Sequence, residues 1–468
     1  MKKTILLCAR LVSYVILAVI CWFSCGFLGA KWVWGEVDMA MVIQHTQLLF
    51  TVPWAPYWKE LTAGFTGFFI LTFIACRYWK ISMAIVLACT LFYVGKNAYS
   101  AYMGEANFYS KHYIIPRVKS VQSPKNIIVV SLESVDDMVT NPDVVLGGEN
   151  LIPALTALKE QGVSVRGYHR ISSMMPTIPA FYAMNCGITR GAGNWETFEN
   201  LFSSYNLGAF PNAVCVSDIL KKHAYKNMFV MGAKLTDEGV GHFFEKHPFD
   251  VVMGKDELQQ AGYKMLNSTY RIPDSELFRF TQDFLTQTQK DNPFFVYVVT
   301  GNTHGPKEFV MEPFCEEKYH DGRDAYKCLD RMTADFVSWC QKQSWYKDTV
   351  IFLVGDHTAW GDSDGFNGKL AKKIRNQRQI YNVVLNRGQP VQTGEIKKDF
   401  TQVDIAPTIL ESAGFDIRPH QLGLGVSLWA QTPTFVEKLG RRKFQRLLNK
   451  AGADYQQILY GKKFQTND

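Results

Sequence analysis

Five short, continuously apolar runs alternate with amphipathic stretches between residue 125 and about residue 430, and this alternation constrains the fold more than any other feature of the sequence. Uninterrupted runs rich in Val, Ile and Phe are typical of strands that are buried on both faces of a parallel sheet. Strands and helices in alternation predict an α/β domain with a mostly parallel sheet covered by helices on both faces. The predicted strands are 126–133, 227–233, 293–300, 349–355 and 379–385, and the predicted helices are 152–161, 214–223, 274–289, 326–343 and 403–413.

Three hydrophobic segments precede this domain. The first, 4–30, has Arg10 as its only charge and is long enough to cross a bilayer, which takes about 20 apolar residues. The segments 61–76 and 81–95 are shorter, but aromatic residues at their ends extend them to spanning length. We therefore expect a transmembrane region of about three helices over residues 1–97. A cleavable signal peptide is the alternative for the first segment.

Basic residues predict how these helices are oriented. Lys2, Lys3 and Arg10 lie at the start of the first segment. Arg77 and Lys80 lie in the short link between the second and the third. Both places are therefore expected in the cytoplasm, and an odd number of crossings puts everything after about residue 100 outside. The aromatic residues of 99–116 suit either a helix at the membrane interface or an ordinary linker, within an expected linker of residues 98–124.

Cysteine usage agrees with an exported domain. Half of the ten cysteines fall in the hydrophobic segments, and the others are Cys186, Cys215, Cys315, Cys328 and Cys340. In an oxidising compartment we expect disulfides between Cys186 and Cys215 and between Cys315 and Cys328, each closing a loop of modest length, with Cys340 free on a helical stretch. No CxxC spacing occurs, which argues against a structural zinc site.

The net charge of +7 is spread along the chain except near its C-terminus. There, residues 439–450 have the pattern of a basic amphipathic helix, which could lie on anionic lipid or be an ordinary solvated surface helix. We expect residues 433–468 to form a basic tail that follows an α/β domain of residues 125–432. Nucleic acid is not an expected partner, because it has no access to this compartment.

Polar side chains follow three of the predicted strands. Glu133 ends the first, His304 follows the third, and Asp356 and His357 end the fourth. In open α/β sheets the reactive groups gather at the carboxyl ends of the strands, so these four side chains are expected at one edge. Each of them alone is more often part of a polar turn. Together, their oxygen and nitrogen donors without a thiolate suit one divalent metal ion, Zn²⁺ or Mn²⁺, with one coordination position open.

Thr177 is the candidate nucleophile for that open position. It precedes Ile178 and Pro179, and a proline in the first turn of a helix places Thr177 at or near the N-cap. Backbone N–H groups at such a helix start bind phosphate or sulfate, and a metal-bound threonine alkoxide beside them is a nucleophile for phosphoryl or sulfuryl transfer. A plain N-cap is the alternative role, and Ser172 and Ser173 are competing nucleophiles.

Five motifs resemble the alkaline phosphatase and sulfatase superfamily: LES at 132–134, TIP at 177–179, THGP at 303–306, GDH at 355–357 and VDIAPTILESAG at 403–414. Within it, the chain is most similar to membrane-anchored phosphoglycerol transferases, such as lipoteichoic acid synthase and the MdoB-type enzyme that modifies periplasmic glucans. The stretches 217–235 and 344–357 and the cysteine placements look most like the periplasmic glucan enzyme. The resemblance covers nearly all of the soluble domain.

This resemblance implies a mechanism and a location. One divalent metal ion would be held by Glu133, Thr177, Asp356 and His357. Thr177 would attack the phosphate of phosphatidylglycerol, diacylglycerol would leave, and the phospho-threonine would pass glycerophosphate to a hydroxyl of an envelope glycan or lipid. His304 matches a histidine that contacts the head group, where it could stabilise charge or move a proton. The chain would be a multi-pass protein of the bacterial inner membrane with its catalytic domain in the periplasm.

One departure from the family pattern concerns the donor. Relatives carry a basic residue shortly before the Phe-Asp that matches Phe249 and Asp250, whereas residues 236–241 contain no Lys or Arg, so Lys234 or His242 would have to take its place. A phosphoethanolamine transferase acting on lipopolysaccharide or a glycan, and a catalytically silent member that binds lipid or a partner, therefore remain alternatives. Sulfatases of the formylglycine type need Cys or Ser at the position of Thr177, which argues against sulfate ester hydrolysis. Loops 191–211 and 319–326 are where we expect acceptor specificity.

Overall fold

The computed structural model describes residues 108–119, 124–189, 209–266, 271–288, 292–305, 308–360, 365–387, 394–449 and 452–461. All of these residues belong to one of the two compact units into which the chain divides. The expected transmembrane region, residues 1–97, lies outside the described residues. No helix within the described ranges is both long enough and apolar enough to span a bilayer.

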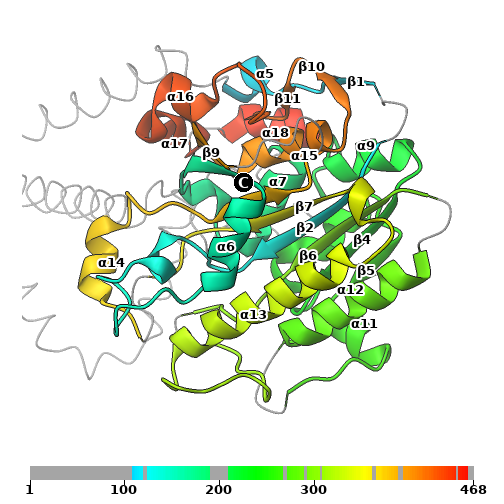
Figure 1. Ribbon diagram of the computed structural model, residues 1–468. Coiled ribbons are helices and arrows are strands. Elements are labelled where there is room, and N and C mark those ends of the chain that lie inside the picture. The colour runs from blue at the N-terminus through cyan, green and yellow to red at the C-terminus, as the bar shows by residue number, and fades with distance from the viewer. Residues whose placement is uncertain are drawn as a thin grey trace, which may run out of the picture. The chain divides into compact units, whose positions relative to one another are not determined.

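An eight-stranded sheet forms the centre of the described unit, in the order β5-β4-β6-β2-β7-β8-β3-β9 (Figure 1). Only β8 runs antiparallel to its neighbours, so the predicted mostly parallel α/β sheet is confirmed. The strands are β2 (Asn126–Leu132), β3 (Val163–Tyr168), β4 (Lys226–Met231), β5 (Val251–Met253), β6 (Phe294–Val299), β7 (Thr349–Gly355), β8 (Asn382–Leu385) and β9 (Gly394–Phe400). Two small antiparallel pairs join β1 (Arg117–Lys119) to β10 (Asp416–Arg418) and β11 (Gln421–Leu422) to β12 (Gly425–Val426).

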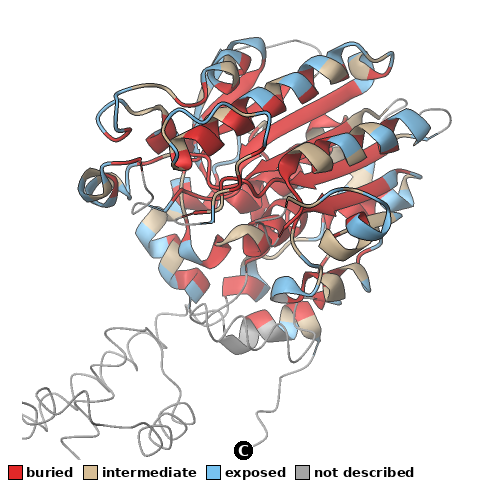
Figure 2. Ribbon diagram, turned by 90° about the horizontal axis from the view of Figure 1, so that it is seen from below, coloured by how far each residue is buried: buried red, intermediate tan, exposed pale blue. Residues whose placement is uncertain are grey.

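The central strands β2, β6 and β7 are buried almost throughout, as Figure 2 shows for the interior of the sheet. Their side chains alternate between two helical layers, so both faces of each strand leave water, and the continuous apolar sequence is the consequence. One layer contains α6 (Pro153–Gln161), α11 (Lys255–Gln260), α12 (Asp274–Thr288) and α13 (Gly322–Gln341), which share a core with Ile128 and Val130. The other contains α7 (Thr177–Cys186), α9 (Val216–Lys222), α10 (Val240–Phe244) and α15 (Ile405–Ser412).

Aromatic rings join this second layer to the sheet. The ring centroid of Phe181 on α7 lies 5.0 Å from that of Phe229 on β4 and 5.0 Å from that of Tyr297 on β6. Large buried rings contribute much of the apolar area that a core removes from water. They fix α7, and with it Thr177, against the middle of the sheet.

The segment expected as a basic tail packs on the domain. It forms α16 (Phe435–Leu439), α17 (Arg441–Asn449) and α18 (Gly452–Tyr460), next to α5 (Phe108–His112) near the start of the described residues. In α17, Phe444, Leu447 and Leu448 are buried while Arg442 and Lys443 are exposed, which agrees with a surface helix of the domain. Phe108 and Tyr109 are buried as well, so these two rings of the expected interfacial segment are not exposed to a membrane surface.

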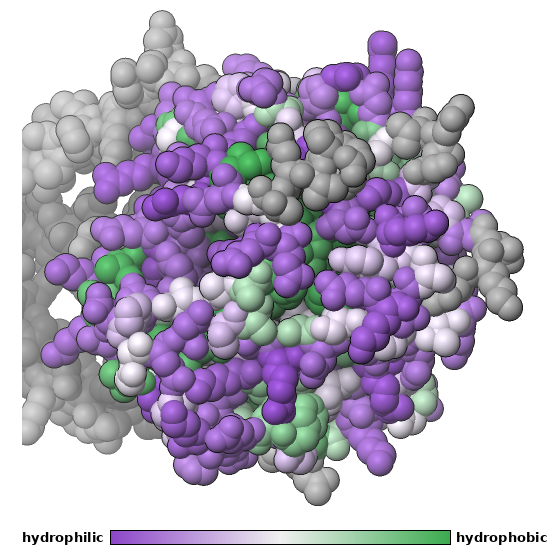
Figure 3. Space-filling model, in the orientation of Figure 1, coloured by the Kyte–Doolittle hydropathy of each residue, from purple (hydrophilic) through white to green (hydrophobic). Residues whose placement is uncertain are grey.

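Both predicted disulfides are present, between Cys186 and Cys215 and between Cys315 and Cys328, and Cys340 is a buried free thiol, as predicted. Outside the core, the face shown in Figure 3 is mostly hydrophilic, and its apolar side chains lie in small separate groups. Among the described residues, the large apolar side chains that are exposed are Ile115, Leu146, Phe314 and Trp360.

Candidate metal and nucleophile site

The sheet register brings the polar strand ends together. β2 and β7 are parallel neighbours with Leu132 opposite Gly355, so Glu133 and Asp356 leave adjacent strands at the same level. On the other side of β2, β6 ends at Val299, and His304 follows it. This is the convergence at the carboxyl edge that the sequence predicted.

Four of the predicted site residues meet there. The nearest ligand atoms of Glu133, Asp356 and His357 all lie within 4.8 Å of one another. His357 Nε2 is 3.4 Å from Glu133 Oε1 and 3.6 Å from Asp356 Oδ2. The Thr177 hydroxyl donates a hydrogen bond to Glu133 Oε2 at 2.7 Å. Two carboxylates and one imidazole therefore lie close together, and the Thr177 hydroxyl is bonded to one of them, Glu133.

These residues fit a divalent metal ion. Glu133, Asp356 and His357 are at most 1% exposed, and neither Asp356 Oδ2 nor His357 Nε2 has a hydrogen-bond partner among the described residues. A buried polar atom without a partner costs about 1–3 kcal/mol, and a cation between these atoms would satisfy both. Oxygen and nitrogen donors without a thiolate are the ligands that Zn²⁺ and Mn²⁺ share.

Neighbouring groups hold the ligands in place. Ser134, in a left-handed conformation with φ of 58°, donates its N–H to Asp356 Oδ1 at 2.8 Å and its hydroxyl to Glu133 Oε1 at 2.6 Å. The Nδ1 of His357 lies 3.1 Å from the carbonyl oxygen of Thr358, which fixes the ring with Nε2 toward the carboxylates. The sequence did not identify this role of Ser134, because a single residue with positive φ leaves no pattern outside Gly, Asn and Asp.

The two carboxylates of the cluster influence each other's ionisation. Burial raises the pKa of Asp356, and the neighbouring charge of Glu133 raises it further. Burial opposes ionisation of Glu133 too, but the charges of His357 and His304 and the hydrogen bonds from Ser134 and Thr177 lower its pKa. Two carboxylates this close therefore resist ionising together, and a bound cation would remove that conflict.

Thr177 is the first residue of α7, and Pro176 precedes it as the N-cap. Thr177 therefore follows the N-cap, and its hydroxyl donates to Glu133, so the alternative role as a plain N-cap is wrong. Ser172 and Ser173 lie in the preceding 3-10 turn (Ser172–Met174). Of these three hydroxyls, the structure records a hydrogen bond to the carboxylates of the cluster for Thr177.

A second row of charged residues lies beside the cluster. His304 Nδ1 is 2.8 Å from Glu308 Oε2, and Arg271 Nη2 is 3.7 Å from the same oxygen. Arg271 is 6% exposed and donates from Nη1 to the carbonyl of Gly301 at 3.0 Å. Burial lowers its pKa, while the negative charges of Glu133, Asp274 and Glu308 oppose that change. Arg271 thus supplies a cation near Glu133 that sequence reasoning missed, because no motif surrounds it.

Lys234 and His242, the predicted substrate-binding residues, each lie within ion-pairing distance of a carboxylate outside the cluster. Lys234 Nζ lies 3.6 Å from Asp256, and His242 Nδ1 lies 2.9 Å from Glu245. Neither belongs to the cluster of metal-ligand atoms within the described residues. Their role in binding a substrate stays a prediction.

Another group of ligand-type residues, Cys215, Asp218 and His247, has a structural explanation. The sulfur of Cys215 is bonded to Cys186, so no thiolate is present there. His247 Nδ1 lies 2.8 Å from Asp218 Oδ2, and its Nε2 lies 3.1 Å from the carbonyl of Ala209. Both ring nitrogens are therefore engaged without a metal.

The sequence matches the family described as Sulfatase over residues 125–415. Among curated proteins, it is similar to phosphoglycerol transferase I of Salmonella paratyphi B, with 28% identity over 322 residues, covering 66% of this chain and 40% of that protein. The same enzyme of Salmonella choleraesuis is 28% identical over 320 residues, covering 66% and 39%. The chain thus spans about two fifths of the length of these curated relatives.

Among solved structures, a lipoteichoic acid synthase from Listeria monocytogenes has a TM-score of 0.52 and 16% identity, covering 66% of this chain and 78% of that one. This likeness concerns the fold alone. The family match covers more than half of the chain and contains Glu133, Thr177, His304, Asp356 and His357. The chain belongs to the sulfatase family of the alkaline phosphatase superfamily.

Proposed function

We propose that this chain is a metal-dependent phosphotransferase that moves phosphoglycerol from phosphatidylglycerol to an envelope glycan or lipid through a phospho-threonine at Thr177. The observation that carries the proposal is the 2.7 Å hydrogen bond from Thr177 to Glu133, inside a buried set of metal-ligand atoms. The names of the curated relatives support the choice of donor. The hydrophobic segments of residues 1–97 support a location at the membrane, where this lipid is found.

Glu133, Thr177, Asp356 and His357 would hold one divalent ion. When bound, it would neutralise negative charge on the phosphoryl group and lower the pKa of the threonine hydroxyl. Glu133 orients Thr177 Oγ1 at the first turn of α7, where backbone N–H groups and the helix dipole favour an anion. These groups place a phosphate diester beside the hydroxyl that attacks it.

In the first half-reaction the Thr177 hydroxyl gives up its proton to solvent. Thr177 Oγ1 then forms a bond to phosphorus while the bond from phosphorus to the diacylglycerol oxygen breaks. That oxygen leaves with a proton, and His304 is the residue beside the site that can donate it. In the second half-reaction the acceptor hydroxyl attacks phosphorus and loses its proton to His304. Thr177 Oγ1 leaves phosphorus and takes up a proton from solvent. Glu308 holds His304 in place, and the charge of Arg271 favours the anionic head group.

The test uses the full chain in detergent, loaded with Zn²⁺ or Mn²⁺ and incubated with labelled phosphatidylglycerol or phosphatidylethanolamine. Mass spectrometry of peptides that contain Thr177 should show a phosphoglycerol adduct, which the Thr177→Ala variant lacks. An adduct from phosphatidylethanolamine alone would replace the proposal with a phosphoethanolamine transferase. The absence of an adduct from either lipid, with metal present, would favour a catalytically silent binding protein.

A further inference from the structure

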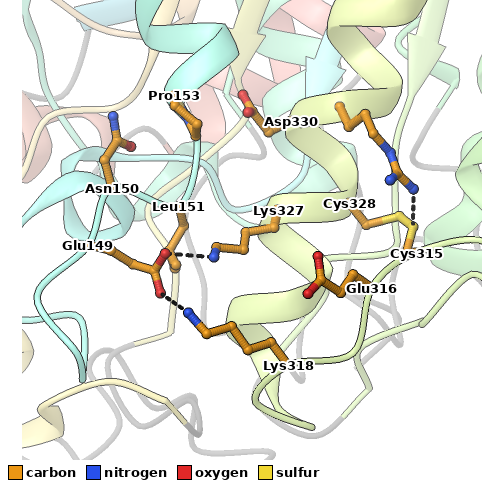
Figure 4. Close-up of a pocket in the computed structure, with 11 residues that line it drawn as sticks. Glu149, Asn150, Leu151, Pro153, Cys315, Glu316, Lys318, Lys327, Cys328 and Asp330 are labelled. Carbon is orange, nitrogen blue, oxygen red and sulfur yellow. Dashed lines mark hydrogen bonds and ion pairs between the residues drawn. A yellow bond between two sulfur atoms is a disulfide. The ribbon is translucent and has the colours of Figure 1, made fainter.

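A cavity of about 300 Å³ lies between the segment that leads into α6 and the first half of α13 (Figure 4). Its lining includes Glu149, Lys318, Lys327 and Arg331, and the Cys315–Cys328 disulfide forms part of its wall. The disulfide ties the segment before α13 to the helix itself, so one side of the cavity is held together covalently. A cavity of this size is large enough for a small ligand or for part of a larger one.

The cavity lies at the same edge of the sheet as the candidate active site. Its lining comes from the segments that follow β2 and β6, the two strands whose ends lead to Glu133 and His304. Tyr326, which precedes Lys327 on α13, donates its hydroxyl to the carbonyl of Ser134 at 3.1 Å. Ser134 in turn donates its hydroxyl to Glu133, so Tyr326 and Ser134 connect the helix that lines the cavity to the candidate active site.

The charged residues of the cavity largely neutralise one another. Glu149 lies 2.6 Å from Lys327 and 4.0 Å from Lys318, as the dashed lines in Figure 4 show, and it also accepts a hydrogen bond from Tyr319. Asp330 accepts hydrogen bonds from the backbone N–H groups of Ala154 and Leu155. No excess of positive charge selects an anion here. The lining instead offers donors and acceptors side by side, which suits a ligand whose hydroxyls both donate and accept.

An exposed aromatic ring lies beside this lining. Phe314 is 54% exposed, and the Arg331 guanidinium lies 5.6 Å from its ring centroid. Arg331 also donates to the carbonyl of Phe314 at 2.9 Å, which fixes the two side chains next to each other. A flat apolar ring next to paired polar groups is complementary to a sugar, which has an apolar C–H face and a polar hydroxyl rim.

We propose that this cavity is an acceptor subsite that binds a neutral, polyhydroxylated glycan. The inference rests on the proposed function, because it names the class of acceptor that would receive the phosphoglycerol group. The sugar face would lie on Phe314, and its hydroxyls would bond to Glu149, Lys327 and Arg331. The transferable hydroxyl would belong to a unit outside the cavity, nearer to Thr177.

The first test measures binding of neutral glucohexaoses with β-1,2, β-1,3 and α-1,4 linkages to the full chain in detergent, by calorimetry. At least one of them should bind, and Glu149→Gln, Phe314→Ala and Arg331→Ala should each weaken that binding by about tenfold, since each removes a contact or pairing of the cavity. Lys347→Ala is the matched control, because Lys347 is an exposed cation just before β7, at the opposite edge of the sheet. Thermal melting of each variant checks that the fold is retained.

The second test separates this inference from the proposed function. The three cavity variants should form the Thr177 adduct at the rate of the unmodified chain, while the KM for the glycan acceptor rises about tenfold. The Thr177→Ala variant should bind the glucohexaose as the unmodified chain does, so its binding tests the subsite even if no adduct forms in any variant. Two results would overturn the subsite: binding that none of the three substitutions changes, or binding of a sulfated hexaose with no binding of the neutral ones.

Discussion

The hydroxyl of Thr177 donates to Oε2 of Glu133 at 2.7 Å, across a sequence separation of 44 residues. Glu133 leaves the end of β2, and Thr177 begins α7, a helix that packs its aromatic ring of Phe181 onto the same sheet. The core of the domain therefore fixes both partners. If Thr177 is the nucleophile, as we propose, its fixed position means that little reorganisation precedes the reaction.

Replacing Thr177 tests that relationship directly. Thr177→Ala should abolish the adduct and lower transfer by about 10³-fold or more, because it removes the hydroxyl that donates to Glu133 at the start of α7. Thr177→Ser keeps the hydroxyl and should retain a measurable fraction of the transfer. Transfer of labelled phosphoglycerol is the readout, and Ser173→Ala serves as the control. Full activity of Thr177→Ala would move the nucleophile to another residue.

Removing the metal should lower the stability of the domain. A ligand that binds only the folded state stabilises it by about 2.7 kcal/mol at a concentration of 100 times Kd, so chelation should reduce the Tm. Adding Zn²⁺ or Mn²⁺ should restore the Tm, and the ion that raises the Tm more is the one that binds the site more tightly. Asp356→Asn removes an oxygen with no hydrogen-bond partner among the described residues and should make the Tm insensitive to the chelator. An equal chelator effect in the parent and in this variant would place the ion elsewhere.

Glu308 lies 2.8 Å from Nδ1 of His304, and its replacement tests whether it positions that histidine. Glu308→Gln should lower kcat by about tenfold. A positioned acid or base contributes about 10²–10⁴-fold to the rate, and losing only its orientation should cost a part of that contribution. Because both residues act in one unit, adding Glu308→Gln to His304→Ala should cost little more than His304→Ala alone. Glu317→Gln is the matched control, since Glu317 pairs with the exposed His320 at 3.2 Å. Additive losses in the double variant would show that Glu308 acts independently of His304.

Sequence reasoning worked best where one physical requirement acts over several residues. The run from Thr349 to Gly355 is buried on both faces, which demands apolar residues throughout, and its predicted bounds agree with β7. Edge strands leave a weaker pattern: β9 exposes Glu395 and Lys397, so it has no continuous apolar run and was not among the predicted strands. The convergence of Glu133 and Asp356 was predictable because both end neighbouring buried strands.

The supporting residues of the site were harder to predict. Ser134 acts through a backbone conformation, and Arg271 acts through its burial near Glu133, and neither property has a local sequence pattern. Glu308 left a weak signal, since it lies four residues after His304. Contacts between residues that are distant in the sequence are created by the fold, so they become visible only with the structure.

Asp404 gives the domain a pH-dependent stability that can be measured. Burial raises its pKa to about 7, although the N–H groups of Val426 and Thr401 and the charge of Lys398 oppose this. Between about pH 4 and pH 7 the folded state then holds a proton that the unfolded state has lost, so stability falls with rising pH by about 1.4 kcal/mol per unit. Asp404→Asn cannot titrate, and its Tm should fall less than that of the parent between pH 5 and pH 7. Asp416→Asn, at a partly exposed carboxylate paired with Arg418, should follow the parent, and parallel curves for the parent and Asp404→Asn would contradict the assignment.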